Sequence, residues 1–158
     1  MNLYLVVKTL HILSSVLLVG TGFGTAFYLY FINRTRSVVA IAAVSRLVVR
    51  ADWWFTTPAV IFQPLSGIWL AHSAGWPWST PWLATSIALY ALAGVCWLPV
   101  VWLQVDLARM AQVAVSAGET TLPPRYWRYA KLWERLGYPA FIAMVVVYFL
   151  MVTKPAFA

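Results

Sequence analysis

The chain has 158 residues, of which 63% are hydrophobic and 9% are charged, and its formal net charge is +7. This composition excludes an ordinary water-soluble domain, in which about a quarter of the residues are charged. It also gives no indication of a nucleic-acid-binding protein, because the basic residues flank apolar runs instead of forming one basic face. Cys96 is the only cysteine, so no intramolecular disulfide is predicted.

Four apolar segments, each long enough to cross a bilayer, divide the chain. A transmembrane helix needs roughly 20 apolar residues, and these segments cover residues 3–32, 53–72, 81–104 and 136–153. The first segment has no basic stretch before it and no small-residue cleavage site after it, so we interpret it as a retained helix and not a signal peptide. The sequence therefore predicts an all-α fold: a single transmembrane domain over residues 1–158, built as an integral membrane four-helix up-and-down bundle.

Two of the links are amphipathic. Residues 33–52 place arginines among small aliphatic residues, which predicts an amphipathic cytoplasmic helix between the first two spans, lying on the membrane or continuing the first helix. Residues 105–135 contain a glycine, a proline pair and a basic-aromatic run. That run has two interpretations, a belt of snorkelling side chains or a site for lipid or a partner protein.

The lysines and arginines predict the orientation. Nine of the eleven lie in these two links, at positions 34, 36, 46, 50, 109, 125, 128, 131 and 135. The positive-inside rule makes that side cytoplasmic. We therefore expect a multi-pass protein with both termini, and the Trp-rich link 72–80, outside the cytoplasm.

Three of the predicted helices carry polar and aromatic residues on one face at helical spacing. The faces are Tyr4, Lys8, His11, Ser15, Leu18, Gly22 and Thr25 on the first helix, Asp52, Thr56, Gln63 and Gly67 on the second, and Ser86, Tyr90, Ala93, Trp97 and Gln104 on the third. Such faces are the expected lining of an intramembrane pocket. The alternative is that the serines, threonines and glutamines only form hydrogen bonds between helices.

His11 is the candidate metal ligand. It lies roughly 12 Å inside the outer end of the first helix, where a neutral imidazole needs a partner. The sequence has no cysteine pair, no second intramembrane histidine four residues away and no carboxylate cluster, so a bare zinc or copper site is poorly supported. A haem iron needs only one or two axial ligands. The alternative for His11 is an ordinary hydrogen bond between helices.

Three further residues are candidates for the same cofactor site. His72 is a candidate second axial ligand, although its depth and its helical angle both fit poorly. Lys8, one turn from His11, either snorkels to the headgroups or receives a haem or porphyrin carboxylate. Arg50 has the same two interpretations, and Asp52 is a neighbour that could neutralise it.

A resemblance to a known family follows from the order of these residues. Lys8-x-x-His11, followed by an apolar run through Gly20, Phe27, Tyr28 and Leu29, resembles the first helix of the HemJ-type protoporphyrinogen IX oxidases. Arg50 followed by Thr56-Thr57-Pro58 resembles the start of that family's second helix, and Trp82-Leu83 is a weaker third match. The resemblance covers roughly the first hundred residues of the chain.

The resemblance implies a haem b protein of the bacterial inner membrane, with four or five helices. It makes His11 the axial ligand and places Arg50 in the haem or substrate site. The sequence departs from the family at Ser86, where the family has a lysine, and at Trp97, where some members have a histidine. The chain is therefore more similar to related bacterial membrane families that share the helical core than to the oxidases themselves.

Two function hypotheses from different classes follow. The first is a b-type haem protein that transfers electrons or oxidises a hydrophobic, porphyrin-like substrate, as a haem-dependent membrane oxidoreductase with a membrane or cytoplasmic redox partner. The second is a non-catalytic membrane subunit that anchors a partner protein. Both hypotheses place the chain in the lipid bilayer, and neither involves nucleic acid. Both are compatible with a homo-oligomer.

Overall fold

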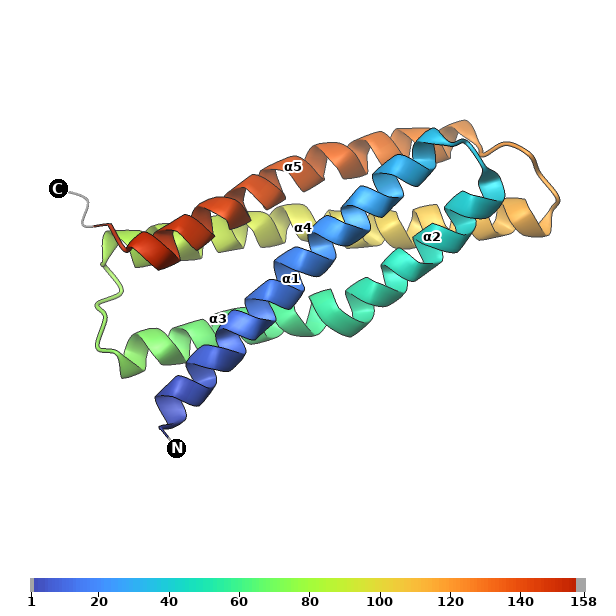
Figure 1. Cartoon of the computed structure of the whole chain (residues 1–158). Coiled ribbons are helices and arrows are strands. Elements are labelled where there is room, and N and C mark those ends of the chain that lie inside the picture. The colour runs from blue at the N-terminus through green and yellow to red at the C-terminus, as the bar shows by residue number, and fades with distance from the viewer. Residues whose placement is uncertain (1, 156–158) are drawn as a thin grey trace.

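The computed structural model describes residues 2–155, and within that range every regular element is helical. The elements are α1 (Leu3–Arg34), α2 (Val38–Ala51), the π-helical turn η1 (Asp52–Thr56), α3 (Thr57–Ser73), α4 (Pro81–Ser116) and α5 (Pro124–Thr153), as Figure 1 shows. Three of them, α1, α4 and α5, are long and apolar enough to cross a membrane. The predicted all-helical class is confirmed, and three of the four predicted spans lie in these long apolar helices, whereas the predicted span 53–72 lies in the shorter η1 and α3.

Local signals in the sequence end the helices. Arg36 has a left-handed backbone, with φ of 58°, and breaks the chain direction after α1. Ser37 then caps α2 by accepting a hydrogen bond from the backbone N–H of Ala40 at 3.4 Å. Gly75 and Gly118, with φ of 70° and 69°, follow the ends of α3 and α4. Glycine adopts this conformation without the steric cost that other residues meet, which is why it commonly closes a helix.

The last two helices extend beyond the predicted spans. Instead of the ranges 81–104 and 136–153, α4 runs to Ser116 and α5 begins at Pro124, so most of the link 105–135 is helical. Hydropathy marks where a helix leaves hydrocarbon, not where it ends. Beyond the apolar part, the basic residues are exposed, while a buried face continues along both helices through Leu103, Leu107, Ala111 and Ala114 on α4 and Tyr126, Ala130 and Trp133 on α5.

The link before the second span also differs from the prediction. The chain turns back after Arg36, so α2 does not continue α1, and α2 packs against α1 and α4. Its buried face, Val38, Ile41, Ala42, Ser45 and Val48, belongs to the main core cluster or lies beside it. α2 then runs through η1 into α3 without interruption (Figure 1). The amphipathic pattern is real, but its apolar face packs against protein.

The helices form two groups that are joined at one end. α1 packs against α2, η1 and α3, while α4 packs along α5. α2 also packs against α4, and this contact holds the groups together where most of the basic residues lie. We call the opposing sides of α1–α3 and α4–α5 the seam. The main hydrophobic core lies at the basic end, whereas a smaller cluster of Ala71, Trp82, Leu83 and Leu150 lies at the other end.

One hydrogen bond crosses the seam where a proline interrupts α3. Pro64 has no N–H, so the carbonyl of Val60, four residues earlier, lacks its usual helical donor. The hydroxyl of Tyr90 on α4 donates to that carbonyl at 2.7 Å. The group freed by the proline thereby fixes α3 against α4.

This arrangement predicts a coupling between two substitutions. Tyr90→Phe should lower the free energy of unfolding by about 1–3 kcal/mol, because it leaves the Val60 carbonyl unpaired. In a Pro64→Ala background the new N–H of residue 64 can bond to the Val60 carbonyl. Tyr90→Phe should then lower the free energy of unfolding by less. Denaturant unfolding of the purified protein in detergent would measure this double-mutant cycle. If Tyr90→Phe lowers the free energy of unfolding equally in the wild-type and Pro64→Ala backgrounds, this role of Tyr90 is contradicted.

Candidate functional site

A cavity of about 420 Å³ lies in the seam. α1 lines it between residues 18 and 31, α4 between 90 and 104, and α5 between 133 and 144, with Asp52, Thr56 and Val60 completing the wall. A pocket lined by all three of the predicted polar faces is thus present, although seven of the sixteen predicted face residues do not line it. The predicted residues that line it are Leu18, Gly22, Thr25, Asp52, Thr56, Tyr90, Ala93, Trp97 and Gln104.

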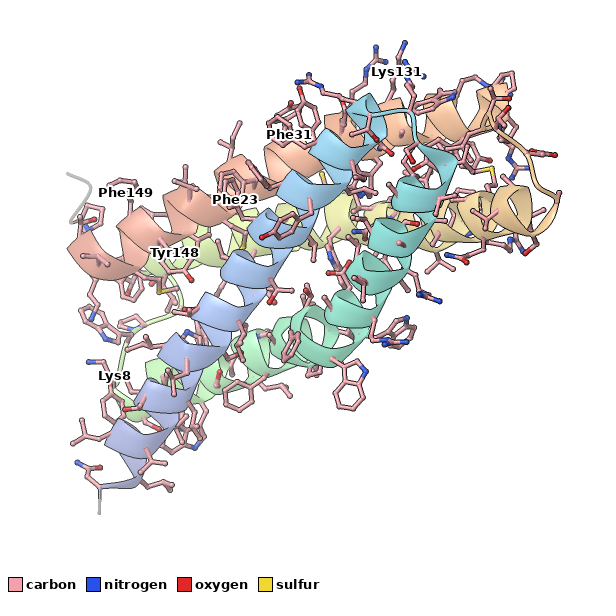
Figure 2. All side chains as sticks on the ribbon, turned by 45° about the vertical axis from the view of Figure 1, so that its right-hand side comes forward. Lys8, Phe23, Phe31, Lys131, Tyr148 and Phe149 are labelled. Carbon is pink, nitrogen blue, oxygen red and sulfur yellow. The ribbon has the colours of Figure 1, made fainter. Side chains whose placement is uncertain are left out.

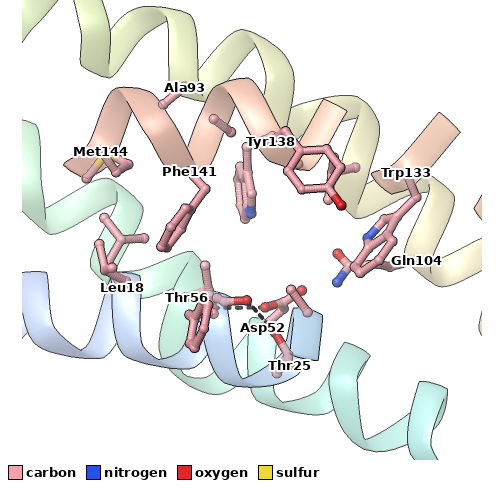
Figure 3. A pocket seen from close by; sticks show the side chains of 18 of the residues that line it. Leu18, Thr25, Asp52, Thr56, Ala93, Gln104, Trp133, Tyr138, Phe141 and Met144 are labelled. Atoms are coloured by element: carbon pink, nitrogen blue, oxygen red, sulfur yellow. Dashed lines mark hydrogen bonds between the residues drawn. The ribbon is translucent and has the colours of Figure 1, made fainter. Parts of the chain in front are cut away.

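The polar groups gather at one end of the cavity. We call Asp52, Thr56, Gln104 and Trp133 the polar end; Figure 3 shows them across from the apolar part near Leu18. Both Asp52 and Thr56 belong to η1, in which the N–H of the residue after the turn bonds to the Asp52 carbonyl, five residues back. Such π-turns are rare and frequently occur at functional sites. Here the turn brings both side chains to the cavity, and Thr56 Oγ1 donates to Asp52 Oδ1 at 2.9 Å.

Two buried atoms at the polar end have no hydrogen-bond partner in the protein. They are Oε1 of Gln104, an acceptor on a side chain that is 5% exposed, and Nε1 of Trp133, a donor on a residue that is 6% exposed. Leaving such an atom unpaired costs about 1–3 kcal/mol. A ligand with complementary polar atoms would remove that cost.

The charge of the cavity is opposite to that of the chain. Its wall contains Asp52 and Glu134, two of the four acidic residues of the protein, and none of the lysines, arginines or histidines. Asp52 is 6% exposed, and the ion pairs within residues 2–155 all involve Asp106. An ionised Asp52 in this position therefore has no cation beside it, which is unfavourable at low dielectric.

Aromatic side chains line the side of the cavity between α1 and α5. Phe23 of α1 stacks on Phe141 of α5 with ring centroids 5.4 Å apart. Both line the cavity, and they are 55% and 40% exposed. Figure 2 shows Phe23 and Phe31 along the side of α1 that is next to α5. Stacked aromatic side chains of α1 and α5 therefore form part of this side of the cavity.

His11 forms a contact between helices. Its Nδ1 lies 2.7 Å from Oγ of Ser66, and Gln63 Nε2 donates to its backbone carbonyl at 2.7 Å. Because α1 and α3 approach closely here, a Cβ added to Gly67 would lie 3.3 Å from Cε1 of the ring. The interhelical hydrogen bond left open for this residue is present. His11 does not line the cavity, whose wall begins on α1 at Leu18, about 10 Å further along the helix.

The other predicted site residues do not line the cavity either. Lys8, Arg50 and His72 are exposed, and none of them lines the cavity. Arg50 makes no ion pair with Asp52, which takes its hydrogen bond from Thr56. The structure therefore does not bring the predicted residues together around one cofactor.

These positions allow a test of whether the cavity fits haem b. Haem needs an axial ligand that faces the cavity and groups that accommodate two propionates. The cavity wall holds no histidine, and its carboxyl groups at Asp52 and Glu134 would repel propionates. In residues 2–155 no three His, Cys, Asp or Glu side chains are grouped as a metal site either. The residues present do not fit haem in this cavity, and we derive no chemistry from it.

The fourth wall of the cavity was not predicted. α5 contributes Trp133, Glu134, Gly137, Tyr138, Ala140, Phe141 and Met144. No motif marks these residues, although positions 133, 137, 140 and 144 share the three- and four-residue spacing of one helix face. This spacing is the signal from which the contribution of α5 to the cavity wall could have been predicted.

Comparisons with known proteins establish the family. A family model described as "Predicted integral membrane protein (DUF2269)" matches residues 5–155. No curated protein and no solved structure matches the chain. The relation to the HemJ-type oxidases, the haem and the redox or subunit roles stay predictions. Because the match covers nearly the whole chain, this protein belongs to the DUF2269 family of predicted integral membrane proteins.

Proposed function

We propose that this protein binds a hydrophobic small molecule, taken up laterally from the bilayer, in the cavity of the seam. The observation that carries the proposal is the pair of unpartnered atoms, Gln104 Oε1 and Trp133 Nε1, at one end of an otherwise apolar space. A ligand with a hydrophobic body and a polar head would match this cavity, with its head at the polar end and its body along the apolar walls. Ligand sites are commonly apolar cavities with a few placed polar groups.

The aromatic wall supports lateral entry. Phe23 and Phe141 meet through side chains alone, and rotation of either ring would widen the passage between α1 and α5. Side-chain rotation is far faster than the separation of packed helices. A ligand dissolved in the bilayer would thus reach the cavity without leaving hydrocarbon.

The proposal includes a membrane topology with four crossings. η1 and α3 together cover residues 52–73, about 33 Å of helix at 1.5 Å per residue, which is enough to cross beside α1, α4 and α5. The basic end would lie in the cytoplasm of a bacterial cell, and both termini would lie in the periplasm.

Reporter fusions test this topology. Alkaline phosphatase fused after Gly75 should be active and green fluorescent protein there dark, with the opposite result after Gly118, because the two glycines end α3 and α4 at opposite ends of the bundle. Arg128→Ala should not invert the protein, since most basic residues remain in place. The reverse pattern of reporters would contradict the proposed orientation.

A matched pair of glycine substitutions tests ligand binding. Gly22 lines the cavity and Gly20 does not, and a Cβ meets no atom within 4 Å at either position. Gly22→Leu should lower the affinity for the neutral fluorophore N-phenyl-1-naphthylamine at least tenfold, by filling cavity space, while Gly20→Leu should leave it unchanged. Fluorescence titration in phosphatidylcholine nanodiscs measures both. Equal affinities in the two variants would contradict binding in the cavity.

Absorption spectra test the haem hypothesis separately. Protein purified from cells supplied with haem should show no b-type bands before or after dithionite, because His11 faces Ser66 and not the cavity. A stoichiometric haem that His11→Ala removes and His72→Ala retains would restore the predicted axial ligand and contradict the fit described above.

A further inference from the structure

The charge of the cavity wall points to the ligand class. Building on the ligand-binding function proposed above, we propose that the ligand is a lipophilic amine, bound as its ammonium cation, with Asp52 as the counter-ion. Asp52 and Glu134 supply two carboxyl groups, and no basic side chain lines the cavity of a chain whose net charge is +7. Complementary charge selects against ligands of the wrong sign.

The acceptors at the polar end match an ammonium head. Thr56 donates to Oδ1 of Asp52, and the Gln104 side chain is a second hydrogen-bonding neighbour of the same carboxyl group. A carboxylate accepts at about four lone-pair sites, so sites remain for a donor from the ligand. Oε1 of Gln104 is a second buried acceptor without a partner, and Gln104 and Asp52 line the same cavity. An ammonium group has up to three N–H donors and no acceptor. An alcohol has one donor, and a carboxylate has none.

The walls suit the rest of such a ligand. Beyond the polar end the cavity is lined by aromatic and aliphatic side chains, among them Trp97, Tyr138 and Phe141. Aromatic faces attract organic cations within about 6 Å of a ring centroid. A bare metal ion would lack ligands here, because no three acidic, His or Cys side chains gather in residues 2–155. The unpaired donor Trp133 Nε1 is left for a neutral oxygen of the ligand or for water.

Three ligands with the same twelve-carbon chain test the charge preference. Dodecylamine, dodecan-1-ol and dodecanoate would compete with N-phenyl-1-naphthylamine for the protein in phosphatidylcholine nanodiscs at neutral pH. We expect dodecylamine to displace the fluorophore at a concentration at least tenfold lower than dodecan-1-ol, with dodecanoate the weakest. Asp52→Asn should reduce the amine preference over dodecan-1-ol to about twofold, because the variant lacks the charge of the counter-ion.

The control removes an acidic residue elsewhere. Glu119→Gln neutralises an exposed carboxylate outside the cavity and should keep the wild-type ranking. Gln104→Leu removes the second acceptor and should lower the amine preference about threefold. If neither Asp52→Asn nor Gln104→Leu folds, the order in which the three ligands compete for the wild-type protein still tests the amine preference.

The outcomes separate the two proposals. If none of the three ligands displaces the fluorophore and Gly22→Leu does not weaken its binding, the ligand-binding function itself is wrong. If dodecan-1-ol or dodecanoate competes as well as dodecylamine in the wild-type protein, the cavity binds ligands but the amine inference is overturned. An amine preference that Asp52→Asn leaves intact would equally overturn the role of Asp52.

Discussion

A polar atom buried in hydrocarbon must find its partner within the protein or in a ligand, and most of this fold satisfies that requirement between helices. The carbonyl freed by Pro64 receives the hydroxyl of Tyr90. His11 bonds to Ser66, and Gln63 bonds to the His11 carbonyl. These bonds fix α3 against α4 and α1. Four buried side-chain atoms within residues 2–155 lack such partners, and two of them, Gln104 Oε1 and Trp133 Nε1, lie together at the polar end of the cavity.

The hydrophobic pattern predicted the cavity better than it predicted the helices around it. The faces of the first three spans were found by helical spacing alone, and nine of their residues line the cavity. α4 and α5 are longer than the predicted spans because apolar composition reports the solvent around a helix and not the length of its hydrogen-bond ladder. α5 was missed as a wall because its lining residues are ordinary aromatic and small side chains without a motif.

His11 shows why an unusual residue is an ambiguous signal. A histidine at that depth needs a partner, and the sequence alone does not distinguish a metal from a neighbouring helix. The answer depends on the approach of α1 to α3, which Gly67 permits by leaving room for the imidazole. Gly67 was already part of the predicted polar face of the second helix. Its contact with His11 was not predicted, because it depends on the register between α1 and α3.

The position of Asp52 follows from the continuous ladder through α2, η1 and α3. If a surface helix had ended before a separate span, Asp52 would lie at the membrane boundary, where Arg50 and water could neutralise it. Within one ladder, residues two apart point about 200° apart around the axis, so an exposed Arg50 places Asp52 inward. A cation in the cavity would compensate an ionised Asp52, because the basic residues of the protein lie outside the cavity wall. The basic residues on which the proposed membrane orientation rests all lie outside the cavity wall that contains Asp52.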